Sequence, residues 1–270
     1  MLRPMDLHLD GKRALVTGGT RGIGKAIARA LATEGCDVMI AGRDRDGLVA
    51  CAAELGPQTG RRVLPVVVDT GDDGSVEAMV AACVEQLGGI DILVNNAAKP
   101  MGQATPPKLA EITTELFWDD VNVKVMGYLR CARAAAPHMI AQGWGRIINI
   151  SGLGARSTGS AIGSIRNVGV AALTKNLGDE LGRSGINVTV VHPGLTRTER
   201  TASVLAARAG AAGVDEAEME RRMGAGSALG RIIESEEVAD LVVFLASPRS
   251  VAVNGDAIAC GGGQLGVIHY

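Results

Sequence analysis

Short apolar runs alternate with longer helical stretches along the chain. The runs predict seven strands, at Arg13–Thr17, Asp37–Ala41, Val63–Val68, Ile90–Val94, Arg146–Ile150, Asn187–Val191 and Asp256–Ala259. The stretches between them predict helices at Gly22–Glu34, Arg45–Leu55, Asp72–Gln86, Trp118–Gln142, Ile165–Arg183 and Glu236–Leu245. Because the strands are almost continuously apolar, we expect them to be parallel and covered on both faces. The pattern predicts an α/β fold with one doubly wound parallel sheet.

The segment 196–233 interrupts this alternation. It is rich in alanine and glycine and carries a charged cluster at Glu216–Arg222. An insertion after the C-terminal end of a strand lies where a substrate lid would be, so we expect a lid; a solvated helical hairpin is the alternative. The lid residues Ala202, Val204, Leu205 and Ala206 indicate an apolar pocket face or, equally, a core.

Composition narrows the class of protein. With 270 residues and 47% hydrophobic content, the chain can form one large core, and we expect a single domain over residues 1–270. A net charge of −2 gives no indication of nucleic-acid or membrane binding. The five cysteines show no Cys-x-x-Cys spacing, and the four histidines show no metal-ligand spacing. We therefore expect a cytoplasmic protein without a metal site.

A glycine-rich turn, Thr17–Gly24, follows the first predicted strand and opens the first helix. Gly18 permits a tight turn, Gly22 lets the backbone approach a pyrophosphate, and Gly24 lets helix and strand pack closely. Free N–H groups at the helix N-terminus then face the phosphates. The turn therefore predicts a Rossmann-type dinucleotide site.

The spacing Gly-x-x-x-Gly-x-Gly resembles that of the short-chain dehydrogenase/reductase family, and further motifs extend the resemblance almost end to end. They are Asn95–Ala98 after the fourth strand, Pro193–Thr198 after the sixth, and Glu236–Ala239 with Phe244–Ser247 in the last helix. The resemblance implies an NAD(P)-dependent oxidoreductase. It also implies that Thr198 reaches the nicotinamide carboxamide and that Asp69 binds adenine.

Two arginines bear on the choice of cofactor. Gly42 stands at the end of the second strand, where an acidic residue would bind the ribose of NAD, and Arg43 follows it. With Arg21 in the glycine turn, this favours NADP, with NAD as the alternative. The residues predicted to bind the cofactor are Gly18, Thr20, Arg21, Gly22, Ile23, Gly24, Arg43, Asp69, Thr70, Asn96, Ala97, Ala98, Pro193, Gly194, Thr196 and Thr198.

The catalytic motif of the resembled family, Tyr-x-x-x-Lys, occurs nowhere in the sequence. The two tyrosines are Tyr128 and Tyr270, and neither has a lysine four residues later. Matching Ala171–Lys175 to the family places Gly163 at the tyrosine position and Asn167 at the lysine position. The family's catalytic serine falls at Gly152, so that Ser151 replaces it only if the backbone shifts.

The family's catalytic asparagine matches Lys124, three residues before Gly127. Lysine and asparagine have thus exchanged places, and Lys124 lies on an apolar stripe with Val121, Val125 and Tyr128. A lysine on such a stripe costs free energy unless it is paired or functional. A snorkelling side chain, or a register that makes Asn122 the family's asparagine, are the alternatives.

These residues give Lys124, Asn167 and Ser151 as catalytic candidates. The first hypothesis is an atypical NAD(P)-dependent oxidoreductase acting on a carbonyl or alcohol group of a small molecule. A catalytically silent dinucleotide-binding protein and a non-redox, dehydratase-like enzyme are the alternatives. The resemblance also implies a homodimer or homotetramer that pairs the two long central helices.

Overall fold

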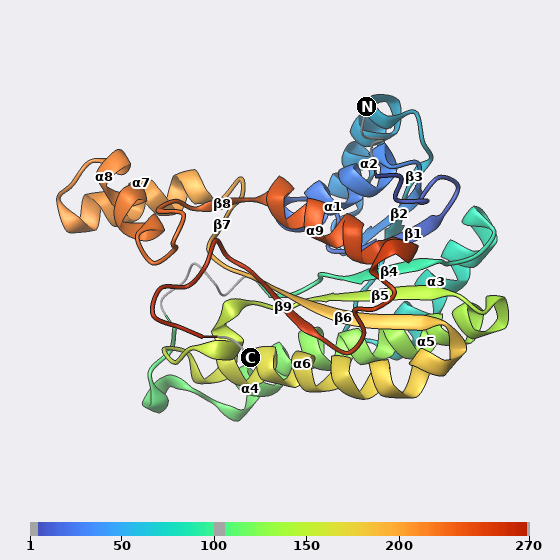
Figure 1. Cartoon of the computed structure of the whole chain (residues 1–270). Coiled ribbons are helices and arrows are strands. Elements are labelled where there is room, and N and C mark those ends of the chain that lie inside the picture. The colour runs from blue at the N-terminus through green and yellow to red at the C-terminus, as the bar shows by residue number, and fades with distance from the viewer. Residues whose placement is uncertain (1–4, 100–105, 269–270) are drawn as a thin grey trace.

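A computed structural model describes residues 5–99 and 106–268 of the chain. Its main sheet has seven parallel strands in the order β3-β2-β1-β4-β5-β6-β9 (Figure 1). The strands are β1 (Arg13–Thr17), β2 (Asp37–Gly42), β3 (Val63–Val67), β4 (Ile92–Asn95), β5 (Gly145–Ile150), β6 (Ile186–Pro193) and β9 (Ala257–Cys260). The chain order reverses between β1 and β4, which is where a doubly wound sheet opens a ligand crevice. The predicted fold class is confirmed.

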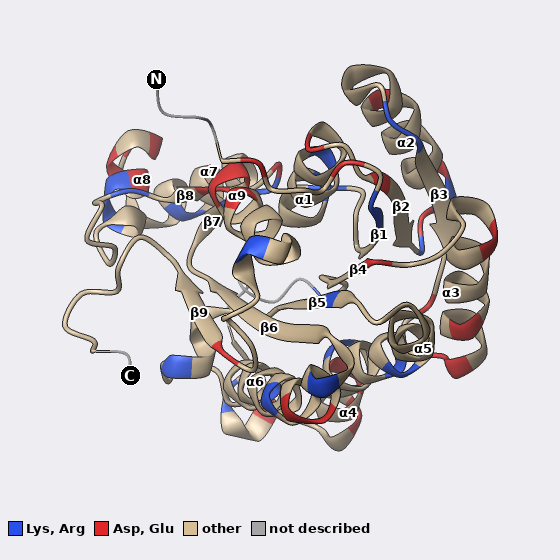
Figure 2. Cartoon of the chain, turned by 45° about the vertical axis from the view of Figure 1, so that its right-hand side comes forward, with Lys and Arg blue, Asp and Glu red and all other residues tan. Residues whose placement is uncertain are grey.

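Helices cover both faces of this sheet. One face carries α1 (Gly22–Thr33), α2 (Arg45–Thr59) and α9 (Ser235–Ala246), and the other carries α3 (Asp73–Leu87), α5 (Gly127–Gln142) and α6 (Ala161–Leu181). Short 3₁₀ turns occur at Leu109–Glu111, Leu153–Arg156, Gly182–Ser184 and Pro248–Ser250. Charged residues are spread over the helices and loops, while the strands are largely uncharged (Figure 2).

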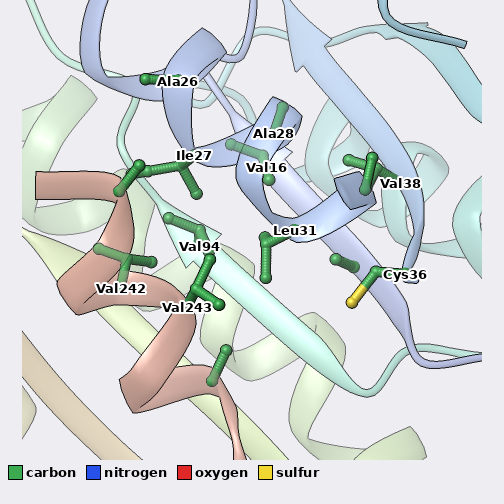
Figure 3. Packing of buried hydrophobic residues seen from close by; sticks show 14 of the residues in the cluster. Val16, Ala26, Ile27, Ala28, Leu31, Cys36, Val38, Val94, Val242 and Val243 are labelled. Carbon is green, nitrogen blue, oxygen red and sulfur yellow. The ribbon is translucent and has the colours of Figure 1, made fainter. Parts of the chain in front are cut away.

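The core on the first face joins α1 and α9 to the middle of the sheet (Figure 3). Ile27 and Leu31 of α1 and Val242 of α9 are completely buried and pack with Val16 and Val94 of the sheet. Full burial of an aliphatic side chain of this size is worth about 1.5–3 kcal/mol. These contacts hold α1, and with it the glycine turn, firmly on β1.

The predicted long helix Trp118–Gln142 is divided in the structure. It begins as α4 (Thr114–Val121), because the Thr113 hydroxyl accepts a hydrogen bond from the Leu116 N–H at 3.1 Å. A π-helical turn, Asn122–Met126, then separates α4 from α5. Such turns shift the phase of a helix and are frequent at functional sites.

Other helix boundaries also differ from the sequence prediction. The helix α6 begins at Ala161, four residues early, because Ser160 caps it by accepting from the Gly163 N–H at 3.1 Å. The helix α2 continues past Leu55 to Thr59 and ends where Gly60 takes a φ of +68°. Both positions of interest on α6, Gly163 and Asn167, are therefore helical.

The segment 196–233 forms a helical hairpin that projects beyond one end of the sheet (Figure 1). Two short strands, β7 (Thr196–Arg197) and β8 (Ile233–Glu234), pair at its base, and α7 (Thr201–Ala212) packs on α8 (Glu216–Gly224). Leu205, Ala209 and Met219 form a small core between the two helices. Among the residues described, no helix is long and apolar enough to cross a membrane.

Candidate active site

A cleft of about 1080 Å³ lies beyond the carboxyl ends of the central strands. Its walls are the glycine turn after β1, the segments after β2, β4, β5 and β6, the start of α6 and the base of the hairpin. Every residue predicted from the sequence to bind the cofactor lines this cleft. Of the three catalytic candidates, Ser151 and Asn167 line it, whereas Lys124 lies behind its wall.

The glycine turn has the shape that a pyrophosphate site requires. Gly18 has a φ of +66°, and a Cβ there would lie 2.9 Å from Nδ2 of Asn96. A Cβ on Gly24 would collide with the carbonyl oxygen of Gly18. Any side chain at these two positions would therefore displace either the turn or the first turn of α1. The residues present fit a dinucleotide with its phosphates at the N-terminus of α1.

Asn96 and Thr17 lock the glycine turn to the end of β4. The Asn96 side chain donates to the carbonyl oxygens of Thr17 at 3.2 Å and Gly18 at 3.0 Å. The Thr17 hydroxyl in turn accepts from the backbone N–H groups of Asn96 at 3.0 Å and Ala97 at 3.1 Å. Asn96 therefore shapes the cleft by positioning the turn.

An acidic side chain occupies the N-terminus of α1. The Glu199 carboxylate accepts a hydrogen bond from the Gly22 N–H at 2.9 Å. Glu199 lies just after the Pro193–Thr198 motif, at the base of the hairpin, and it lines the cleft. Its carboxylate thus takes a donor that a cofactor phosphate would use. This contact could not be predicted from a local sequence pattern, because 177 residues separate the partners.

Arg21, in the turn after β1, and Arg43, directly after β2, both line the cleft. Both arginines are exposed, so each has room to reach a ligand. Asp44 also lines the cleft, but its carboxylate accepts from the Gly47 N–H at 3.2 Å and caps α2. Asp69, at the adenine position that the resemblance implies, accepts from the Gly71 N–H at 2.9 Å.

The three catalytic candidates meet at Ser151, which directly follows β5. The Lys124 ammonium donates to the Ser151 carbonyl oxygen at 3.1 Å. The Ser151 hydroxyl donates to Oδ1 of Asn167 at 3.2 Å and lies equally close to the Asn167 carbonyl oxygen. Lysine, serine and asparagine therefore form one connected group spanning the π turn, β5 and α6.

Lys124 is almost completely inaccessible, with 4% of its surface exposed. The pKa of its ammonium is lowered to about 7, mainly by burial and also by the positive charge of Arg166, while the negative charge of Asp120 opposes both. The side chain does not snorkel to solvent. The Asn122 amide donates to the Gly71 carbonyl oxygen at 3.4 Å.

Gly163 and Gly152, which the resemblance matches to the family's tyrosine and serine, both lie in the wall of the cleft. Gly163 lines the cleft next to the Ser160 cap, and a Cβ there would lie 2.8 Å from the Ser160 hydroxyl. Gly152 also lines the cleft, and its N–H donates to Nδ1 of the buried His192 at 3.3 Å. His192 thus fixes the backbone next to Ser151. Tyr270, the second tyrosine of the sequence, lies outside the described residues.

Sequence reasoning missed a buried ion pair beside this group. Nη1 of Arg166 donates to both carboxylate oxygens of Asp120, at 3.0 and 2.8 Å. Arg166 lines the cleft one position before Asn167, while Asp120 lies on α4. The one sign in the sequence was Arg166 itself, a charged residue directly before the candidate Asn167.

The hairpin presents a different face to the cleft than expected. None of Ala202, Val204, Leu205 and Ala206 lines the cleft, and Leu205 is committed to the hairpin's own core. The hairpin base instead contributes mostly polar residues, among them Thr198, Glu199 and Arg200. The prediction that those four residues form an apolar face of the pocket is therefore wrong. For Leu205, the alternative prediction of a core position is confirmed.

Comparison with known proteins agrees with this architecture. Residues 18–264 match the family model described as enoyl-(acyl carrier protein) reductase. The sorbitol dehydrogenase of Cereibacter sphaeroides is 36% identical over 247 residues, covering 90% of this chain and 93% of that protein. The crystal structure of L-sorbose reductase from Gluconobacter frateurii, complexed with NADPH and L-sorbose, has a TM-score of 0.92 at 30% identity, covering 98% of this chain and 100% of that chain.

A second solved structure is similarly close. It is a variant of actinorhodin polyketide ketoreductase with NADPH, with a TM-score of 0.84 at 38% identity over 93% of this chain and 96% of that one. The chain belongs to the short-chain dehydrogenase/reductase family, a family of oxidoreductases with a Rossmann fold.

Proposed function

We propose that the protein is an atypical NADP-dependent reductase of a small carbonyl compound. The observation that carries the proposal is the connected group Lys124–Ser151–Asn167, in which Ser151 and Asn167 line the cleft and Lys124 lies behind its wall. Gly163 leaves the tyrosine position without a side chain, so more of the cleft is open to substrate there.

Bound NADPH would supply the hydride for the carbonyl carbon. In our proposal the Ser151 hydroxyl turns from Asn167 to the substrate oxygen and delivers the proton, which solvent then replaces. Serine is a weak acid, so the oxygen also needs positive charge nearby to stabilise its developing negative charge. Lys124 provides such charge from behind Ser151 and acts as a positioning residue, because its ammonium holds the Ser151 backbone.

The preference for NADP rests on Arg21 and Arg43. Both line the cleft near the ends of β1 and β2, and Gly42 provides no carboxylate to bind a ribose 2′-hydroxyl. A guanidinium binds phosphate through charge-assisted hydrogen bonds, so a 2′-phosphate would be held well at this end of the cleft. NAD remains the alternative cofactor.

The test is NADPH oxidation by the wild-type chain across a panel of aldehydes, ketones and sugars. With a substrate found, we expect Ser151→Ala to lower kcat by about 10²-fold, the lower range for loss of a proton donor. Cofactor affinity should stay within tenfold, because the glycine turn is untouched. Ser184→Ala, outside the cleft, is the matched control and should keep full activity. An active Ser151→Ala variant would remove Ser151 from the mechanism.

A catalytically silent dinucleotide-binding protein is the second candidate. Two observations favour it. The Ser151 hydroxyl already donates a hydrogen bond to Asn167, and Lys124 lies behind the cleft wall, where it does not contact a bound substrate. Tight NADP binding by calorimetry, together with no turnover across the panel, would support it over the reductase.

A further inference from the structure

Arg166 places a buried positive charge in the wall of the cleft. Only 7% of its surface is exposed, and its ion-pair partner Asp120 is 3% exposed. Two charges so deeply buried cost several kcal/mol each to remove from water, and their attraction compensates only when their hydrogen bonds are well satisfied. The hydrogen bonds of Asp120 are satisfied, because both of its carboxylate oxygens accept from Arg166.

The guanidinium itself is only partly satisfied. All of its hydrogen bonds within the described part of the chain leave from Nη1, two to Asp120 and one to the Lys99 carbonyl oxygen at 3.4 Å. Nε is buried and has no hydrogen-bond partner among the described residues. Buried polar groups in proteins are nearly always paired, so an orphaned donor on a charged group beside a cleft requires an explanation.

We propose that Arg166 binds a carboxylate group of the substrate, so that the carbonyl compound reduced here is an oxo acid. Nε and Nη2 form the edge of a guanidinium that matches the two oxygens of a carboxylate. Asp120 holds Nη1 and fixes the plane of the group, which is the arrangement a preorganised anion site needs. This inference rests on the proposed function only for the carbonyl; the carboxylate site stands on the geometry of Arg166.

The charges around the site agree with an anionic ligand. Asp120 neutralises Arg166, Asp119 neutralises the neighbouring Lys99, and Lys124 adds a further cationic group behind this wall of the cleft. The net charge of these groups is therefore positive when Lys124 is protonated and neutral when it is not. A bound carboxylate makes the net charge neutral in the first case and singly negative in the second. A neutral ligand could accept from the same Arg166 donors, but its hydrogen bonds to the charged guanidinium would be weaker than those of a carboxylate.

The experiment is calorimetric binding of hexanoate and of hexanamide to the full chain saturated with NADP. The two probes have the same length and differ in the charged end, and neither has a carbonyl that can be reduced. We expect the wild type to bind hexanoate at least tenfold more tightly than hexanamide, the scale of a charge-assisted hydrogen bond. Equal affinities in the wild type would overturn the proposal.

The decisive variant is the double substitution Arg166→Leu with Asp120→Leu. It removes both charges together, so no buried charge is left unpaired and the net charge of the protein is unchanged. We expect the preference for hexanoate to disappear while the affinity for hexanamide stays within about threefold. A preference that survives would overturn the proposal.

Two further variants complete the test. Arg166→Lys keeps the charge near Asp120 but loses the planar pair of donors, so the preference should fall several-fold even if the double variant does not fold. Arg183→Leu removes an exposed arginine just after α6 and should leave the preference unchanged. If the preference depends on Arg166 while no carbonyl compound oxidises NADPH, the carboxylate site is supported and the reductase proposal fails.

Discussion

Lys124 shows how one side chain can tie stability to protonation. Within the described part of the chain its ammonium makes one hydrogen bond, to the Ser151 carbonyl oxygen, and the side chain is almost completely buried. Burial therefore lowers its pKa from 10.5 to about 7. At pH values below 7 the folded protein holds a charge that would be better solvated in the unfolded chain.

We predict that Lys124→Met stabilises the protein, and more so at low pH. Between pH 7 and 10.5 the unfolded chain binds a proton at Lys124 that the folded chain has released, so the wild type gains stability as the pH rises. Each pKa unit is worth about 1.4 kcal/mol, so the gain amounts to about 5 kcal/mol over that interval. Below pH 7 the wild type carries the whole penalty, and the variant carries none.

The measurement is urea unfolding of both proteins from pH 6 to pH 10. The difference in unfolding free energy should be largest at pH 6 and shrink steadily above pH 7. Lys175→Met is the matched control, because Lys175 is exposed and paired with Asp179 on the surface of α6. A constant difference between wild type and Lys124→Met across this range would contradict a buried, titrating lysine.

At the scale of single residues, the sequence predicted part of this site. The apolar stripe on the central helix indicated that Lys124 points inward, and the structure places it there. The bond to the Ser151 carbonyl oxygen was not predictable, because it depends on how the π turn sets the phase of the helix. The Arg166–Asp120 pair joins residues 46 positions apart and has no local pattern that marks it.

At the scale of elements, the glycine turn and its flanking strand and helix were predicted almost to the residue. The reason is that strand β1, the turn and α1 are contiguous, and their sequence pattern is local. Helix boundaries set by caps were less well predicted: Ser160 starts α6 early and Thr113 starts α4 early. The hairpin base carrying Glu199 was missed as a neighbour of α1, because that contact is long-range.

The arginine after β2 gives a prediction on cofactor choice. Arg43 lines the cleft and is exposed, so it can reach a 2′-phosphate without disturbing the fold. We expect Arg43→Ala to weaken NADP binding by about 1–3 kcal/mol, the range for a charge-assisted hydrogen bond, and to leave NAD binding nearly unchanged. Titration of both cofactors measures this. Arg45→Ala is the control, and equal losses for NADP and NAD would refute the assignment.

Glu199 gives a second prediction at this scale. Its carboxylate and a cofactor phosphate would compete for the Gly22 N–H, and the two negative charges repel. Glu199→Gln keeps a hydrogen-bond acceptor but removes the charge. We expect NADP and NAD both to bind roughly three- to tenfold more tightly, because a neutral acceptor makes a weaker bond to the N–H.

Glu216→Gln, which removes an exposed charge at the start of α8, is the matched control for Glu199→Gln and should leave both affinities unchanged. Weaker cofactor binding by Glu199→Gln would mean that Glu199 supports the glycine turn and does not compete for it.

At the scale of the whole molecule, an apolar surface over α4 and α6 remains to be explained. Trp118 is 60% exposed, Ile165 52% and Val168 50%. The small residues Ala132, Ala135 and Ala136 of α5 are buried against the sheet and are not part of this surface. Exposed apolar residues gathered on neighbouring helices are typical of a protein interface.

We therefore predict a homodimer or homotetramer whose subunits pair through the outer faces of α4 and α6. Ile165→Glu with Val168→Glu would bury two carboxylates in that interface, and the cost of desolvating them should shift the protein to a monomer. Light scattering at micromolar concentration measures the change. Val49→Glu is the control: Val49 is 53% exposed on α2, on the other face of the sheet, and its replacement should leave the assembly intact. A wild-type chain that is monomeric at this concentration would refute the prediction, and the apolar surface would then need another occupant.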